Sequence, residues 1–128
     1  MAGSTSTQKL IDTALIIESK GAHEHTIIWL HGFGDSAQGC QSLFTQIQPP
    51  NTRIVLPNAP KQWQTIRGRQ HHVQTWYPDG EITVEKGSEV IESINELIDE
   101  ELKLVNDASH IIIGGFRYVS SFHDTRNA

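Results

Sequence analysis

Two short glycine-containing segments carry residues whose types and spacing suit acyl-transfer chemistry. The first, HGFGD, covers residues 31–35 and directly follows an apolar run. Gly32 and Gly34 permit backbone conformations that other residues avoid, so the N–H of Phe33 between them could be turned into a cleft. A preorganised N–H aimed at a developing negative oxygen is what an oxyanion hole requires. A glycine-rich turn without chemistry has the same pattern, and from this segment alone both interpretations stay open.

The second segment is IIIGGF at residues 111–116, an apolar run that enters a glycine turn. Such a strand commonly delivers a functional side chain at its tip, and the next residue is Arg117. A guanidinium stays protonated at working pH, so Arg117 cannot act as an acyl nucleophile. The sequence therefore predicts no catalytic residue at this tip.

Histidines and phosphate-type loops give weaker signals. His31 lies where a strand ends, and a histidine there more often orients the loop through hydrogen bonds than acts as a general base. The pairs His23/His25 and His71/His72 fit no recognised metal-ligand spacing, so neither a metal site nor another cofactor is expected. The HGFGD loop also lacks the spacing of the phosphate-binding glycine motifs.

The surrounding pattern predicts an α/β fold with a mostly parallel sheet and flanking helices. Strands are expected over residues 13–18, 26–31, 53–56 and 110–115, and helices over 37–48 and 85–105. A long polar loop is expected over residues 58–83. In such sheets, sites lie at the carboxyl ends of the strands, where both glycine segments fall.

Both predicted helices are amphipathic. In the helix over 37–48, Leu43, Phe44 and Ile47 are expected on one side. In the helix over 85–105, apolar residues recur at spacings of three and four, whereas the acidic residues face away. That acid run is interpreted as a solvated face.

Composition excludes several function classes. The chain has 128 residues, and 10 basic against 15 acidic residues give a net charge of −5. This balance argues against nucleic acid or an anionic membrane as a bulk electrostatic partner. Cys40 is the single cysteine, so no internal disulfide can form. No apolar run suits a signal peptide or a membrane span, so we expect a cytoplasmic protein without a stable membrane anchor.

Four segments in order carry a family resemblance: TIIWLHGFGDSAQG, IVLPNAP, TWYPDG and IIIGGF. Together they resemble the N-terminal half of the acyl-protein thioesterase / lysophospholipase-like carboxylesterase family, which has the α/β-hydrolase fold. The resemblance covers about residues 10–116 of a single partial domain (1–128) and leaves 117–128 as an atypical tail. It implies that Phe33 supplies an oxyanion-hole N–H, that Trp76 lies near the substrate cleft, and that the substrates are acyl esters or thioesters of S-acylated proteins or lysophospholipids.

The chain departs from this family at the nucleophile. The family continues GGFSQGG, a nucleophile elbow, whereas here Arg117 stands at the serine position and Val119 replaces a turn glycine. Ser120 and Ser121 follow too late to take its place. The resemblance implies that the acid and histidine of the triad lie beyond residue 128, so the chain is expected to be inactive. The abrupt change at Arg117 is expected to reflect an unspliced intron, with a drifted truncated paralogue as the alternative.

Three functions remain open on the sequence. The first is an incomplete serine hydrolase without activity. The second is a non-catalytic acyl-binding or regulatory module that keeps the cleft around Phe33 and Trp76. The third, an active hydrolase that uses another residue, is the least favoured.

Overall fold

The computed structural model describes residues 9–76 and 84–115, and the following statements concern those residues. Ten short elements follow one another along them. They are α1 (Leu10–Thr13), β1 (Leu15–Ile17), β2 (His25–Leu30), α2 (Ala37–Ile47), β3 (Thr52–Leu56), β4 (Lys61–Ile66), β5 (Arg69–Gln74), α3 (Val84–Val105), the 3₁₀ helix η1 (Ala108–His110) and β6 (Ile111–Gly115).

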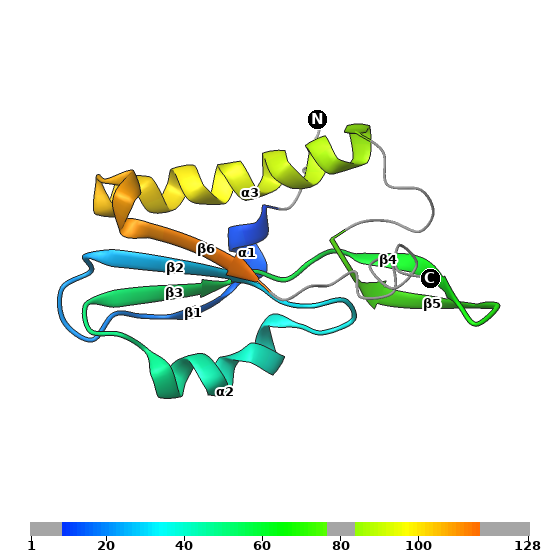
Figure 1. The fold of residues 1–128 in the computed structure, drawn as a ribbon, viewed down its shortest axis with the longest axis horizontal. Helices are drawn as coiled ribbons and strands as arrows, with labels where there is room; N and C mark the ends of the chain where they lie inside the picture. Colours follow the sequence, from blue (N-terminus) through cyan, green and yellow to red (C-terminus); the bar gives the residue numbers. More distant parts are fainter. Residues whose placement is uncertain (1–8, 77–83, 116–128) are drawn as a thin grey trace, which may run out of the picture.

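Four of the strands form one sheet in the order β1-β3-β2-β6. The central strand β2 pairs in parallel with β3 and with β6, and β1 pairs antiparallel with β3. Helix α2 covers one face, whereas α1 and α3 cover the other (Figure 1). The predicted α/β class with a mostly parallel sheet is therefore confirmed.

The strand β2 shows why its sequence is almost uninterruptedly apolar. Ile27 and Trp29 pack against the cluster on the α2 side of the sheet. Ile28, which is fully buried, and Leu30 belong to the cluster on the α3 side. A strand covered on both faces needs apolar residues at odd and even positions alike, and each such side chain stabilises the fold by about 1.5–3 kcal/mol.

Helix α2 matches its predicted span, but its buried face differs from the predicted one. Ser36 caps its start by accepting a hydrogen bond from the N–H of Gly39 at 3.2 Å. The buried residues are Ala37, Cys40 and Phe44, spaced three and four apart. Leu43 and Ile47, which were expected on the same side as Phe44, are exposed, whereas Phe44 is buried. The expectation for these two was wrong because the sheet contacts the stripe that begins at Ala37.

Helix α3 buries one acidic side chain that its pattern did not reveal. Leu97 is buried against the sheet, Ile91 is exposed, and Glu101 is only 1% exposed. The Glu101 carboxylate accepts hydrogen bonds from Thr26 Oγ1 and from Nε and Nη2 of Arg53, each at 3.1 Å. Other acids of this helix do face solvent as expected, namely Glu92, Glu96 and Asp99.

Arg53 joins this buried carboxylate to a second acid. Its Nη1 also contacts the Glu18 carboxylate at 3.1 and 3.2 Å. Burial alone would lower the pKa of the guanidinium, but the hydrogen bonds and charges of Glu101 and then Glu18 outweigh it, so the Arg53 pKa is raised. The pair therefore ties α3 to β3 as a charged, hydrogen-bonded unit.

A β-hairpin occupies much of the predicted 58–83 loop, so that prediction was wrong for residues 61–74. Strands β4 and β5 pair antiparallel, with Trp63 opposite His72. Arg67 and Gly68 form the turn with positive φ values of 52° and 77°, as the tight turns of two-residue hairpins require. The hairpin lies beyond the carboxyl ends of the parallel strands (Figure 1).

Two further differences concern the ends of the sheet. Residues 10–13 form the short helix α1, which the sequence did not indicate, and the first strand shortens to β1. At the other edge, β6 pairs only with β2 among the described residues, and Ile112 and Ile113 are exposed. None of the described helices is long and apolar enough to cross a bilayer.

Candidate functional site

The HGFGD loop leaves the carboxyl end of β2 and is held by two backbone hydrogen bonds. The Asp35 N–H donates to Gly32 O at 3.1 Å, and the Gly34 N–H donates to Gln74 O at 2.9 Å. Gly34 has φ 76°, a conformation that a side chain would strain. Within the described residues the N–H of Phe33 has no hydrogen-bond acceptor. The Phe33 N–H thus stays available directly before two backbone donors that are used, those of Gly34 and Asp35.

His31 is the hub that fixes this loop. It is 1% exposed, and its Nε2 accepts a hydrogen bond from the Ala59 N–H at 3.0 Å. Because Nε2 is an acceptor, Nδ1 carries the proton and donates to Gly32 O at 2.8 Å. Both ring nitrogens are therefore engaged in positioning two loops. This agrees with the interpretation of His31 as a loop-orienting residue and leaves neither nitrogen available as a general base.

Trp76, two residues after the end of β5, also contacts His31. Its indole N–H donates to His31 O at 2.9 Å, and the two rings lie 5.2 Å apart between centroids. The ring is buried and also contributes to the wall of a cavity. Trp76 therefore anchors the end of β2, and the part of its ring that lines the cavity is the part available to a ligand.

Asn58 and Gln74 extend the same network, and the sequence did not single out either one. Asn58 Oδ1 accepts from the Ala37 N–H at 2.8 Å, which ties the β3 end to the start of α2. Its amide donates to Thr13 O at 2.9 Å. Gln74 Nε2 donates to Asn58 Oδ1 and to Ala59 O, both at 3.3 Å. The sequence signal that could have indicated Asn58 is its position directly after a strand and a proline, in the segment PNAP.

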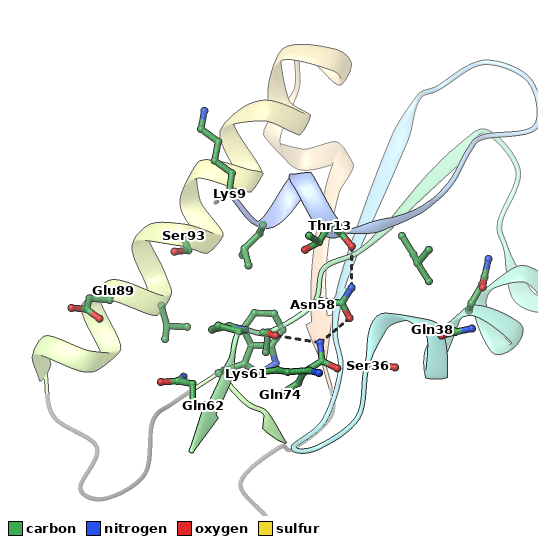
Figure 2. Close-up of a pocket in the computed structure, with 17 residues that line it drawn as sticks. Lys9, Thr13, Ser36, Gln38, Asn58, Lys61, Gln62, Gln74, Glu89 and Ser93 are labelled. Carbon is green, nitrogen blue, oxygen red and sulfur yellow. Dashed lines mark hydrogen bonds between the residues drawn. The ribbon is translucent and has the colours of Figure 1, made fainter. Parts of the chain in front are cut away.

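A cavity of about 1080 Å³ adjoins this network between α1, α3 and the hairpin, as Figure 2 shows. Its apolar lining consists of Leu10, Leu15, Ala59, Pro60, Trp76 and Val90, and the other residues of the wall are polar or charged. Phe33 is not part of this wall. The structure thus places Trp76 at the cavity and Phe33 on the adjoining loop, without bringing their side chains into one pocket.

Cys40 is the other residue whose type suits nucleophilic chemistry. Its thiol is buried in α2, and burial first and the Asp35 charge second raise its pKa above the ordinary value of 9.0. A thiol protonated at neutral pH is a poor nucleophile. Cys40 is therefore not a candidate nucleophile at neutral pH.

The histidine pairs do not converge into a metal site in the part of the chain that the structure describes. His25 stacks on His110 with centroids 4.5 Å apart, and His72 stacks on Trp63 at 4.6 Å. His23 is engaged with Thr26 Oγ1 at 2.7 Å. Ring stacking and local hydrogen bonds account for these three histidines.

The second glycine segment forms β6 up to Gly115, which lies opposite Leu30 at the end of β2. A Cβ on Gly114 would lie 2.6 Å from the ring of Trp29, and one on Gly115 would lie 2.9 Å from Leu30 O. Both glycines are needed for the close approach of β6 to β2. Arg117, which occupies the predicted nucleophile position, lies outside the described residues.

The fold and this loop define an α/β protein of the hydrolase type, with a glycine loop after β2 and two glycines at the end of the neighbouring parallel strand β6. The sequence model of the phospholipase/carboxylesterase family matches residues 11–118, and the chain belongs to this family.

Curated relatives agree with this assignment. Acyl-protein thioesterase 1 homolog 1 of Dictyostelium discoideum is 34% identical over 106 residues, which cover 73% of this chain and 46% of that protein. Acyl-protein thioesterase 1 of Schizosaccharomyces pombe is 33% identical over 110 residues, which cover 80% and 49%. The chain spans about half the length of these relatives.

Solved structures show the same fold at lower identity. Zea mays acyl-protein thioesterase 2 superposes with a TM-score of 0.65 and 23% identity, covering 80% of this chain and 45% of that one. Arabidopsis thaliana SOBER1 gives a TM-score of 0.62 and 22% identity, covering 72% and 49%. The described residues thus match about half of an α/β-hydrolase structure.

Proposed function

We propose that this chain carries the oxyanion-binding part of an acyl-ester or acyl-thioester hydrolase site and does not itself hydrolyse acyl substrates. The observation that carries the proposal is the N–H of Phe33, which has no acceptor among the described residues although its loop is held by His31 and Gln74. Family membership supports acyl esters or thioesters as the ligand class. Arg117 at the serine position removes the nucleophile that hydrolysis needs.

Absence of hydrolysis is tested with the purified chain. We expect no release of p-nitrophenol from p-nitrophenyl octanoate above a no-protein control, and no labelling by a fluorophosphonate probe that reacts with activated serines. Loss of the catalytic serine alone lowers turnover by about a million-fold. Turnover at a rate typical of enzymes, abolished by Ser120→Ala, would reject the proposal.

Oxyanion binding is tested with octanoate, whose carboxylate presents a negative oxygen to the loop. The variant Phe33→Pro deletes the N–H, whereas the matched variant Phe33→Ala keeps it and removes only the exposed ring. A hydrogen bond to a charged group contributes about 1.5–3 kcal/mol, so Phe33→Pro should weaken octanoate binding at least tenfold in calorimetry. Equal affinities of the Pro and Ala variants would show that this N–H does not bind the anion.

A non-catalytic acyl-binding module is the second candidate. It is favoured by one observation: His31, Trp76 and Asn58 hold the loop through hydrogen bonds with Ala59, His31 and Ala37, and these bonds need no catalytic nucleophile. Binding of octanoate by a folded monomer would support this candidate. A folded monomer that binds no acyl ligand at millimolar concentration would exclude it.

A further inference from the structure

The β4–β5 hairpin carries a local excess of positive charge on an acidic chain. Residues 58–76 contain Lys61, Arg67 and Arg69 but no aspartate or glutamate, although the net charge of the chain is −5. These three residues are exposed, and none of them forms an ion pair with another described residue. The hairpin is therefore a cationic surface whose charges are not paired within the described part of the chain.

One face of this hairpin is turned to solvent and has an aromatic residue at its centre. Side chains of a strand alternate between the two faces, and the exposed members of the outer face are Lys61, Trp63, Thr65, Gln70 and His72. Trp63 is 60% exposed, and its ring stacks on His72 with centroids 4.6 Å apart and planes 19° apart. A ring that is already held by a neighbour loses little freedom on binding. Tryptophan beside arginine is typical of the residues that dominate protein interfaces.

The solvent side of α3 has the opposite charge. An acidic stripe runs along it, made of four exposed residues at spacings of three and four, namely Glu89, Glu92, Glu96 and Asp99. None of these acids forms an ion pair with another described residue. Ile91, which lies in the same turn as the first two, is 56% exposed. The helix thus offers carboxylates for cations and an apolar contact for an exposed aromatic ring.

The two surfaces agree in length, and a second copy of the chain can bring them together. The cations of the hairpin span about 20 Å from residue 61 to residue 67, and the acidic stripe spans about 15 Å from residue 89 to residue 99. Within one chain, no ion pair of the described residues joins the hairpin to α3. Each copy carries both surfaces, so a dimer with twofold symmetry makes each contact twice.

We propose that the outer face and tip of the β4–β5 hairpin bind the acidic stripe of α3 on a second copy of this chain. Lys61, Arg67 and Arg69 pair with carboxylates of the stripe, and Trp63 packs against Ile91. The inference goes beyond the proposed function and does not depend on acyl binding.

Charge reversal on the helix separates local complementarity from net charge. Glu92→Lys combined with Glu96→Lys changes the net charge from −5 to about −1, which reduces the general repulsion between copies. We nevertheless expect the dissociation constant, measured by sedimentation velocity over a range of concentrations, to rise about tenfold, because attractive pairs become like-charge pairs. Stronger association of this variant would overturn the inference, since net charge alone would then explain it.

A mixture of two variants tests the pairing itself. Arg67→Glu combined with Arg69→Glu reverses the charge of the hairpin tip instead of the helix. Each double variant alone should associate about tenfold more weakly than the parent chain. An equimolar mixture of the two should associate again, because the reversed hairpin of one chain meets the reversed stripe of the other and the unchanged surfaces pair as before. A mixture that associates no better than its components would overturn the inference.

The apolar contact has its own matched pair of variants. Trp63→Ala should weaken association about tenfold, whereas Leu43→Ala, which truncates an exposed residue of α2, should leave it unchanged. Because Trp63 is exposed, its variant is expected to fold, and circular dichroism checks this. Equal effects of the two variants would show that this ring is not in the contact.

The exposed edge of β6 is a second route to association, so all of these measurements use the full chain with Ile112→Lys as the parent. A parent that stays monomeric at about 1 mM would overturn the inference. Binding of a monomeric parent to phosphatidylserine vesicles, lost in the variant with Arg67→Glu and Arg69→Glu, would also overturn it, because it assigns the hairpin to a membrane surface.

Discussion

Replacing His31 by alanine is the most informative perturbation of the loop hub. The change leaves the Ala59 N–H without its acceptor and removes one of the two donors to Gly32 O, which keeps the Asp35 N–H, in a region where Ala59 and Trp76 are buried. An unsatisfied buried donor costs about 1–3 kcal/mol. Removing a fully buried ring adds a cavity cost, which for aromatic truncations reaches about 3–5 kcal/mol in total. We therefore expect His31→Ala to lower the free energy of unfolding by about 3–5 kcal/mol.

Two conservative variants divide this loss between the nitrogens. The amide of His31→Asn reaches the position of Nδ1 and can donate to Gly32 O, whereas the carbonyl of His31→Gln reaches the position of Nε2 and can accept from Ala59. The free energy of unfolding of each of these two variants should be about 1 kcal/mol higher than that of His31→Ala. Urea unfolding followed by tryptophan fluorescence measures all three. The control His71→Ala, on an exposed hairpin position, should change stability by less than about 0.5 kcal/mol.

The same variants test whether the hub positions the Phe33 donor. If it does, octanoate affinity falls in His31→Ala under conditions where circular dichroism shows a folded protein. A loss of stability below about 1 kcal/mol would refute the view that both ring nitrogens hold buried groups. Asn and Gln variants no more stable than His31→Ala would refute it equally.

Four further outcomes are expected. Glu101→Gln should lower the free energy of unfolding by about 3 kcal/mol in urea titrations, because a buried ion pair loses one partner, whereas the exposed Glu100→Gln should have little effect. The raised pKa of Cys40 contributes stability that is complete below about pH 9 and lost as pH rises through the folded pKa, so Cys40→Ala should show a smaller alkaline loss in pH-dependent melts. Arg117→Ser alone should remain unlabelled by a fluorophosphonate, because a serine without an adjacent base is a weak nucleophile; labelling at ordinary rates would contradict this. The wild-type chain should self-associate in sedimentation velocity through its exposed β6 edge, and Ile112→Lys should reduce the association; an unchanged monomer in both cases would oppose the prediction.

The elements that the sequence predicted well are those with strong apolar patterns. β2 and β3 were found from continuous apolar runs, and α3 from spacings of three and four. The hairpin was missed because neither β4 nor β5 alternates apolar with polar residues along its length. The only local signal for the hairpin was the turn pair Arg67-Gly68. Arg67 has a positive φ, a conformation that asparagine or glycine usually adopts at this position, so the pair does not resemble a common hairpin turn.

The site was predictable only in part, for a related reason. The HGFGD pattern left open both an oxyanion loop and a glycine turn without chemistry, and among the described residues the Phe33 N–H has no acceptor. The partners that hold the loop come from Ala59 and Trp76, which are 28 and 45 residues away from His31. Local pattern carries no information about such pairs. The burial of Glu101 was also not predicted. Glu101 lies on the apolar face of α3, where a charged side chain is unexpected unless its partner Arg53 is known to lie beside it.

Building an oxyanion loop and supplying a nucleophile are separable tasks in this chain. The loop depends on β2, β3, β5 and α2, and on hydrogen bonds whose two partners both lie among the described residues. Under the proposed function, arginine in place of the serine removes the reaction without removing the groups that would bind its negative oxygen. If octanoate binds the wild-type chain and not Phe33→Pro, the acyl-anion site is independent of the catalytic triad, and the family's binding function is encoded largely before the nucleophile.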